Sequence, residues 1–172
     1  MHRLQKLTGA AVLAALLLVG TACGDDDSAG SASGSESTTT TSTTTTPEPV
    51  VREELAVGTP ANAPGQTLYL SRVTIQPDGE IAPHFHEGTQ IANIEAGTLT
   101  YTVVSGTVQV TRADGTVQTV TGPDDIALQP GDALTENQDM IHSAANHGDT
   151  PVVILLASLL TEGAPPSTPV EE

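Results

Sequence analysis

The stretch that decides the fold is Gly79-Glu80-Ile81-Ala82-Pro83-His84-Phe85-His86-Glu87-Gly88-Thr89-Gln90. It places His84 and His86 two positions apart, and Gln90 four positions after the second histidine. Because successive side chains of an extended strand point to opposite faces, both imidazoles project from the same face. Two imidazoles on one face of a strand can bind one metal ion, so this stretch predicts part of a metal site.

A third histidine suited to this site, His142, lies far downstream at the start of another apolar segment. His147 stands beside Gly148 and Asp149, and this polar, glycine-containing context predicts a solvated loop residue instead. A His-x-His pair is a short motif that also arises by chance, so it gains weight only if the fold brings His142 to it.

The segments around these histidines alternate between apolar and polar residues and are broken by Gly, Pro, Asn and Asp, which is typical of short strands joined by turns. No stretch after residue 50 shows sustained helical periodicity, so the sequence predicts an all-β sandwich or barrel. Ser105-Gly106 predicts a hairpin between the two segments that flank it. The predicted strands are residues 67–75, 81–86, 90–94, 99–104, 107–112, 116–120, 124–128, 133–136, 141–146 and 151–160.

The N-terminal region predicts an export signal over residues 1–22. Arg3 and Lys6 precede an apolar run over residues 10–19 that is too short to cross a bilayer. The sequence Thr21-Ala22-Cys23 resembles the lipobox of bacterial lipoproteins, which implies cleavage before Cys23 and its lipidation. An ordinary signal peptide cut after Ala22 is the alternative. The lipobox implies an exported protein anchored by lipid to the outer face of the bacterial membrane.

The rest of the chain divides into a linker, a domain and a tail. Residues 23–50 are rich in Ser and Thr with few apolar side chains, so we expect a disordered linker. Residues 51–163 are expected to form the β-barrel domain, and residues 164–172 a flexible tail. All 21 acidic residues lie after Gly24, against three arginines and no lysine. This charge argues against nucleic-acid binding.

Two motifs here resemble those of the cupin superfamily. The first has the order Gly, His-x-His, Glu, Gly, and its counterparts are Gly79, His84, His86, Gln90 and Gly97, with glutamine in the glutamate position. The second has the order Gly, Pro-x-Gly, His, Asn. Its counterparts are Gly131, Asn137, Asp139, His142 and Asn146, with Asn137 and Asp139 replacing proline and glycine.

The resemblance covers roughly residues 65–160 and is to the small single-domain cupins. It implies a jelly-roll β-barrel with a metal bound by His84, His86 and His142, and with Gln90 as a candidate oxygen ligand. Three imidazoles suit Fe, Zn, Cu or Ni, whereas carboxylate ligands suit Mn, so the loss of the glutamate favours the former group. The loss of the glutamate also removes the obvious general base. Glu87 and Glu136 are candidates to replace it, but strand alternation aims Glu87 away from the histidine face.

The resemblance leaves two functions open. One is a metal-dependent enzyme of the dioxygenase type, and the other is a non-catalytic module that binds or senses a small molecule. A barrel of this size holds one small ligand, and Tyr101 and Met140 are candidate wall residues, with core packing as their alternative role. The resemblance also implies a homodimer formed by pairing of edge strands.

Overall fold

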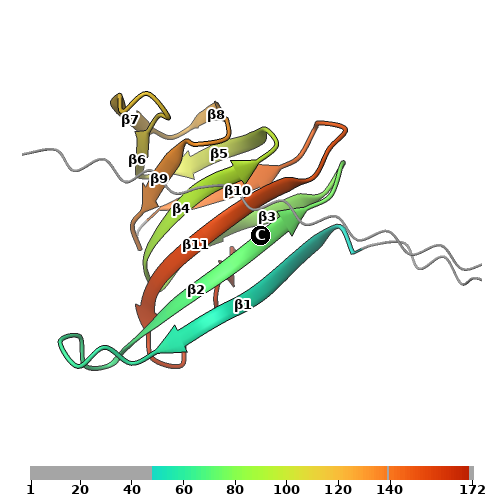
Figure 1. The fold of residues 1–172 in the computed structure, drawn as a ribbon. Helices are drawn as coiled ribbons and strands as arrows, with labels where there is room; N and C mark the ends of the chain where they lie inside the picture. The colour runs from blue at the N-terminus through green and yellow to red at the C-terminus, as the bar shows by residue number, and fades with distance from the viewer. Residues whose placement is uncertain (1–47, 139, 171–172) are drawn as a thin grey trace, which may run out of the picture. The chain divides into compact units, whose positions relative to one another are not determined.

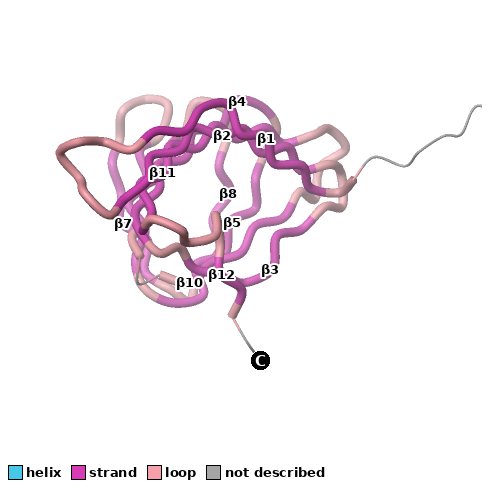
Figure 2. The backbone as a smooth tube through the Cα atoms, turned by 90° about the horizontal axis from the view of Figure 1, so that it is seen from below, coloured by secondary structure: helices cyan, strands magenta, loops and turns pink. Residues whose placement is uncertain are grey.

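The computed structural model describes residues 48–138 and 140–170. The predicted signal peptide, Cys23 and the linker up to residue 47 lie outside the described residues. The described chain is all-β, with two sheets in which every pair of neighbouring strands is antiparallel. The two sheets curve around a common interior (Figures 1 and 2), as the sequence predicted for a jelly-roll barrel. Within these residues no helix has the length and apolar character needed to span a membrane.

The larger sheet contains seven strands and forms the side of the barrel that includes the C-terminal long strand. In spatial order they are β1 (Val50–Gly58), β2 (Gln66–Ile75), β11 (Val152–Thr161), β4 (Gly88–Ala96), β9 (Ala133–Glu136), β6 (Thr107–Thr111) and β7 (Val117–Thr121). The apolar strand β11 lies between β2 and β4 in this sheet (Figure 1), and its side chains alternate between buried and more exposed positions.

The smaller sheet contains five strands and closes the opposite side. Their spatial order is β12 (Thr168–Pro169), β3 (Glu80–Phe85), β10 (Ile141–Ala145), β5 (Leu99–Ser105) and β8 (Asp124–Leu128). The two histidine segments, β3 and β10, are therefore neighbours, although almost sixty residues separate them in the chain. This pairing brings the two sequence motifs together.

The interior is built from aliphatic side chains that alternate inward along the strands. Ile75, Val103, Leu128 and Val152 are fully buried there, and Tyr101 is the aromatic residue of this buried core. Each such side chain contributes about 1.5 to 3 kcal/mol when it leaves water. Apart from Tyr101 and Met140, the core thus consists of Val, Leu, Ile and Ala.

Two residues of the sequence motifs have structural roles. Gly97 has a φ of 74°, and a Cβ there would lie 2.7 Å from the carbonyl oxygen of Pro151, so no other residue fits easily. Asn146 is buried, and its Nδ2 donates hydrogen bonds of 2.9 Å to the carbonyl oxygens of Ile75 and Thr150. Both residues shape the barrel and do not line the predicted site.

The predicted hairpin around Ser105-Gly106 is wrong. β5 and β6 belong to different sheets: β5 pairs with β10 and β8, whereas β6 pairs with β7 and β9. The chain passes from one sheet to the other at Gly106, whose φ of 86° permits the turn. Alternation identifies strands but does not show which sheet each strand joins.

The structure also differs from the sequence-based boundaries at both ends of the domain. β1, for which no strand was predicted, pairs with β2 along its length at the edge of the larger sheet. At the other end, the segment expected to be a flexible tail returns to the barrel. Thr168–Pro169 pairs with β3, and the amide of Val170 donates to the carbonyl oxygen of Pro83. β3 pairs with β10 along one edge, and its other edge provides the hydrogen-bonding groups for this pairing.

Candidate metal centre

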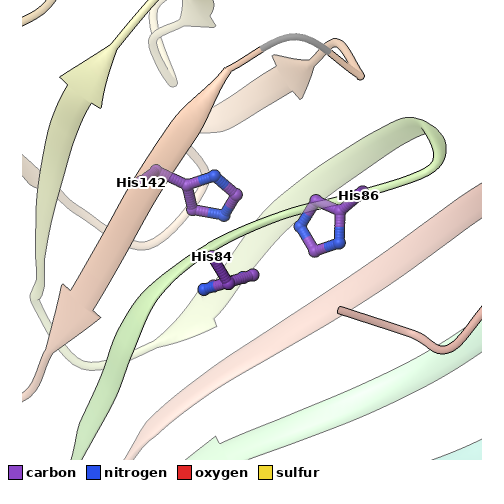
Figure 3. A group of neighbouring side chains, drawn as sticks. All are labelled: His84, His86 and His142. Atoms are coloured by element: carbon purple, nitrogen blue, oxygen red, sulfur yellow. The ribbon is translucent and has the colours of Figure 1, made fainter. Parts of the chain in front are cut away.

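The three histidines predicted to bind metal lie together inside the barrel. His84 on β3 is the register partner of His142 on β10, and His86 follows the end of β3. Their imidazoles face one another (Figure 3), and one nitrogen from each ring lies within 4.8 Å of the others. All three side chains are buried. The structure therefore brings the two motifs to one potential metal site.

Main-chain carbonyl groups orient two of these rings. His84 Nδ1 donates a hydrogen bond of 2.8 Å to the carbonyl oxygen of Ala82, and His86 Nδ1 donates one of 2.8 Å to that of Pro166. With the proton fixed on Nδ1, each neutral ring presents the lone pair of Nε2. This arrangement is typical of metal-binding histidines, whose outer nitrogen is held by a hydrogen-bond acceptor.

His142 is held differently. Tyr101 stacks on its ring, with centroids 5.1 Å apart and an interplanar angle of 19°. Its Nδ1 has no hydrogen-bond partner among the described residues, while its Nε2 lies 3.3 Å from Glu136 Oε1. Burial lowers the pKa of His142 to about 4 and also lowers that of His84. Both rings are therefore neutral at pH 7, the state that can bind a metal.

A carboxylate from the larger sheet completes the cluster. Glu136, at the end of β9, is 4% exposed, and its Oε2 lies 3.3 Å from His86 Nε2. The hydroxyl of Tyr101 donates a hydrogen bond of 2.9 Å to Glu136 Oε1. Burial raises the pKa of Glu136, but the neighbouring imidazoles of His142 and His86 and the hydrogen bond from the Tyr101 hydroxyl together lower it to about 2. Glu136 is therefore ionised.

Gln90 lies in the cluster, on β4 beside Glu136. Its Nε2 donates to Glu136 Oε2 at 3.0 Å and also contacts His86 Nε2, while its Oε1 accepts a hydrogen bond from the hydroxyl of Ser158. A carboxylate can only accept, so the atom of Gln90 that faces Glu136 must be the amide nitrogen. In this orientation the carbonyl oxygen of Gln90, the predicted oxygen ligand, is directed to Ser158.

These residues fit a transition-metal ion. Three imidazoles provide nitrogen donors of the kind that Fe, Zn, Cu and Ni prefer, and the buried carboxylate of Glu136 lies beside two of them. The outer nitrogens of two rings are already satisfied by carbonyl groups, as a metal site requires.

The family model for the cupin domain matches residues 71–158 of this chain. The chain belongs to the cupin family. No curated protein shows a significant match to it.

Several solved cupin structures resemble this cupin at low sequence identity. A cupin superfamily protein from Desulfitobacterium hafniense is 17% identical over 64% of this chain and 77% of its own, with a TM-score of 0.45. The cupin domain of an XRE family transcriptional regulator from Enterobacter cloacae is 16% identical over 64% and 96%, with a TM-score of 0.40. An oxalate oxidase is 19% identical over 73% and 57%, with a TM-score of 0.46.

The histidines of this cupin line a cavity of about 200 Å³. This volume is below the roughly 300 Å³ at which sites for drug-sized ligands begin, so it suits a compound of few atoms. Tyr101 is part of the wall, whereas Met140 is not and contacts Tyr101, with its sulfur 4.0 Å from the Tyr101 hydroxyl. Most of the remaining wall is aliphatic: Val50, Val73, Ile81, Ala92, Leu99, Leu134, Ala144, Ile154 and Leu156.

Sequence reasoning missed three contributors to this site. Pro166 lies 80 residues after His86, and Ser158 lies 68 residues after Gln90, so no local pattern connects them. Arg52, on the unpredicted strand β1, also lines the cavity. Glu136 was named only as a candidate base. Glu87 is exposed, in agreement with the prediction that it points away from the histidines.

Proposed function

We propose that this cupin binds one divalent transition-metal ion through His84, His86 and His142 and acts as a dioxygenase-like oxidoreductase on a small molecule held in the barrel. The observation that carries the proposal is the convergence of three buried imidazoles on the wall of a mostly apolar cavity. A bound ion of this kind supplies Lewis acidity and, when the metal is redox-active, one-electron chemistry.

The chain's own residues bind and orient the small molecule. The aliphatic wall excludes water and selects an apolar body, which strengthens polar interactions inside the cavity. Arg52 lies on the inner face of β1, since it pairs with the buried Val73, and it donates a hydrogen bond of 3.1 Å to Ser71 Oγ.

The charge of Arg52 favours an anionic ligand. Among the described residues, the other two arginines pair with acidic side chains: Arg72 with Glu95 at 3.0 Å, and Arg112 with Asp132 at 2.8 Å. Arg52 has no such partner within 4.0 Å in the described part of the chain. A guanidinium group recognises carboxylates well, so we propose a small, mostly apolar acid as the ligand.

Oxygen consumption tests the catalytic proposal. The protein is loaded with Fe(II) without oxygen and then exposed to air with small carboxylic acids, phenols or thiols. We expect oxygen uptake that matches substrate loss and that disappears in His84→Ala and His142→Ala.

The second candidate is a non-catalytic module that binds the same ligand. One observation favours it: both oxygens of Glu136 already accept hydrogen bonds, so no free carboxylate faces the cavity to remove a proton from a substrate. Ligand binding without oxygen uptake or product, with Fe, Mn, Cu, Ni and Zn in turn, would favour the module and contradict the enzyme.

The proposed location is the outer face of the bacterial cell membrane, with Cys23 as the lipidated residue. The lipobox-like sequence Thr21-Ala22-Cys23 supports this proposal. Incorporation of labelled palmitate in the wild type and its loss in Cys23→Ala would be the expected result. Equal labelling of the two proteins would contradict it.

We also propose that the domain forms a homodimer. Support for this arrangement comes from the exposed side chains of Leu68, Leu70 and Ile91 on the larger sheet, and from the outer edge of β1, which pairs with no strand of the described residues. Light scattering should give twice the mass of the chain, and Leu70→Glu should return it to the monomer mass. A monomer mass for the wild type would contradict the dimer.

A further inference from the structure

Glu136 is a buried carboxylate whose contacts come from both sheets. The cost of removing a carboxylate from water is large unless the group is paired or hydrogen-bonded. Two hydrogen bonds reach it: Tyr101 donates to Oε1 and Gln90 donates to Oε2. Each carboxylate oxygen can accept a second interaction, and on each oxygen this second direction leads to a histidine.

The distances from Glu136 to the histidines are those expected between ligands of one ion. Oε2 lies 3.3 Å from His86 Nε2, and Oε1 lies 3.3 Å from His142 Nε2. Two donor atoms that are each about 2.1 Å from the same ion lie about 3.0 to 3.4 Å apart at octahedral or tetrahedral angles. The carboxylate therefore lies where a ligand beside His86 and His142 would lie.

The proton positions agree with this geometry. His86 carries its proton on Nδ1, because that atom donates to Pro166, so its Nε2 is an acceptor that contacts the amide of Gln90. His142 Nε2 is placed to donate to Glu136 Oε1, since its Nδ1 has no partner among the described residues. In the metal-free protein the Nε2 proton of His142 thus lies between this ring and Glu136, where a bound cation would take its place, and the amide of Gln90 keeps its hydrogen bond to Glu136.

We infer that Glu136 is the carboxylate ligand of the metal centre, and that Gln90 is a positioning residue that holds it. This inference rests on the proposed binding of metal by the three histidines. Gln90 and Glu136 are register partners on the neighbouring strands β4 and β9, so their side chains leave the sheet side by side. Ser158 fixes the amide of Gln90 with its nitrogen toward the carboxylate.

A carboxylate in the site changes the expected metal. The sequence favoured Fe, Zn, Cu or Ni over Mn because Gln90 stood in the position of a carboxylate. With Glu136 the site has three neutral imidazoles and one anionic oxygen donor, a set that suits Mn and Fe as well as Zn. We therefore expect Mn(II) to bind with an affinity that depends on Glu136.

The test is a titration of the full-length protein in detergent with Co(II) and with Mn(II). Calorimetry measures the binding of both ions, and the visible spectrum reports the ligands of bound Co(II). Glu136→Gln should weaken binding by more than about 100-fold and shift the Co(II) bands, because a residue that only supports a ligand typically changes affinity by 10- to 100-fold. Glu87→Gln is the matched control, since it removes an exposed carboxylate next to His86, and it should leave both measurements unchanged.

A second variant tests the inference if Glu136→Gln does not fold. The double variant Gln90→Glu with Glu136→Gln exchanges carboxylate and amide between two adjacent positions and keeps the total charge. It should bind Co(II) within about tenfold of the wild type, with a changed spectrum, since one carboxylate again lies beside the histidines. Failure of a folded double variant to bind Co(II) would overturn the inference.

The outcomes separate the inference from the proposed function. If the wild type binds no Co(II) or Mn(II), the metal site itself is refuted. If the wild type and Glu136→Gln bind Co(II) with equal affinity and the same spectrum, while His142→Ala does not bind, the site stands and Glu136 is not a ligand. A loss of less than 100-fold with an unchanged spectrum makes Glu136 a supporting residue and also overturns the inference.

Discussion

The two sheets hold their parts of the metal centre in different ways. On the side of the five-stranded sheet, main-chain carbonyl groups of Ala82 and Pro166 orient His84 and His86. In the seven-stranded sheet, the side chains of Ser158, Gln90 and Glu136 form a chain of hydrogen bonds across three strands. Substitutions cannot delete a main-chain carbonyl, whereas each link of a side-chain network can be lost. The histidine half of the site should therefore be the more robust half.

Removal of a histidine should have the largest effect. His84→Ala or His142→Ala deletes one of three nitrogen donors, and we expect metal binding to weaken by at least about 1,000-fold, that is, by more than about 4 kcal/mol. Equilibrium dialysis followed by elemental analysis measures it. His147→Ala is the control, because this histidine is exposed and lies outside the cluster. Unchanged metal content in both variants would contradict the site.

Acid should destabilise the metal-free protein through the buried histidines. The pKa of His142 is about 4 in the folded protein because burial disfavours its charged form, against an ordinary 6.5. Between these values the unfolded state binds one more proton, so stability falls as pH falls, by about 1.4 kcal/mol per pH unit and about 3 kcal/mol in all. Burial also lowers the pKa of His84, which acts in the same direction.

Urea unfolding between pH 7 and pH 4, with EDTA present, measures this dependence. His142→Gln should flatten it, whereas His147→Gln should leave it unchanged. A wild-type stability that is constant from pH 6.5 to pH 4.5 would show that burial does not keep these rings neutral.

Loss of a main-chain acceptor should have an intermediate effect. Deletion of residues 164–172 removes β12 and the carbonyl oxygen of Pro166, so His86 loses the acceptor for its Nδ1 proton. We expect metal affinity to fall by about 10- to 100-fold, as for other outer partners of metal-binding histidines. Pro166→Ala keeps the carbonyl oxygen and should bind metal nearly as the wild type does. Calorimetry with Zn(II) compares the three proteins, and an unaffected deletion variant would refute this role.

The smallest effect is expected in the side-chain network of the larger sheet. Ser158→Ala removes the donor to Gln90 Oε1, so the amide is no longer fixed with its nitrogen toward Glu136. We expect metal affinity to fall by less than about tenfold, with a loss of stability of about 1 kcal/mol. Ser143→Ala, on β10, is the control. A loss as large as that caused by the deletion of residues 164–172 would mean that the two sheets do not differ in robustness.

The sequence predicted most of the fold because its signals were local. Alternation, turn residues and the two motifs identified the strands from β2 to β11 and placed His84, His86 and His142 in one cluster. The hairpin at Ser105-Gly106 was wrong because sheet membership depends on contacts distant in the chain. β1 was missed because its inner face carries the charged residues Arg52 and Glu54 in place of an apolar row.

The non-local part of the site could not be predicted. The position of Glu136 depends on the register of β4 against β9, which joins residues 46 positions apart. Even with both strands assigned, a shift of one residue would turn Glu136 out of the barrel. Pro166 reaches His86 only because the C-terminal segment returns to pair with β3. Packing sets both the register of β4 against β9 and the pairing of the C-terminal segment with β3. The sequence contains no local signal for either.

Metal content tests the central claim most directly. The full-length protein is purified from its native host without chelators, and the transition metals are counted by elemental analysis. The site of His84, His86, His142 and Glu136 predicts about one ion per chain. A protein that contains no transition metal, and that takes up none when Fe, Mn, Zn, Cu and Ni are supplied, would contradict it.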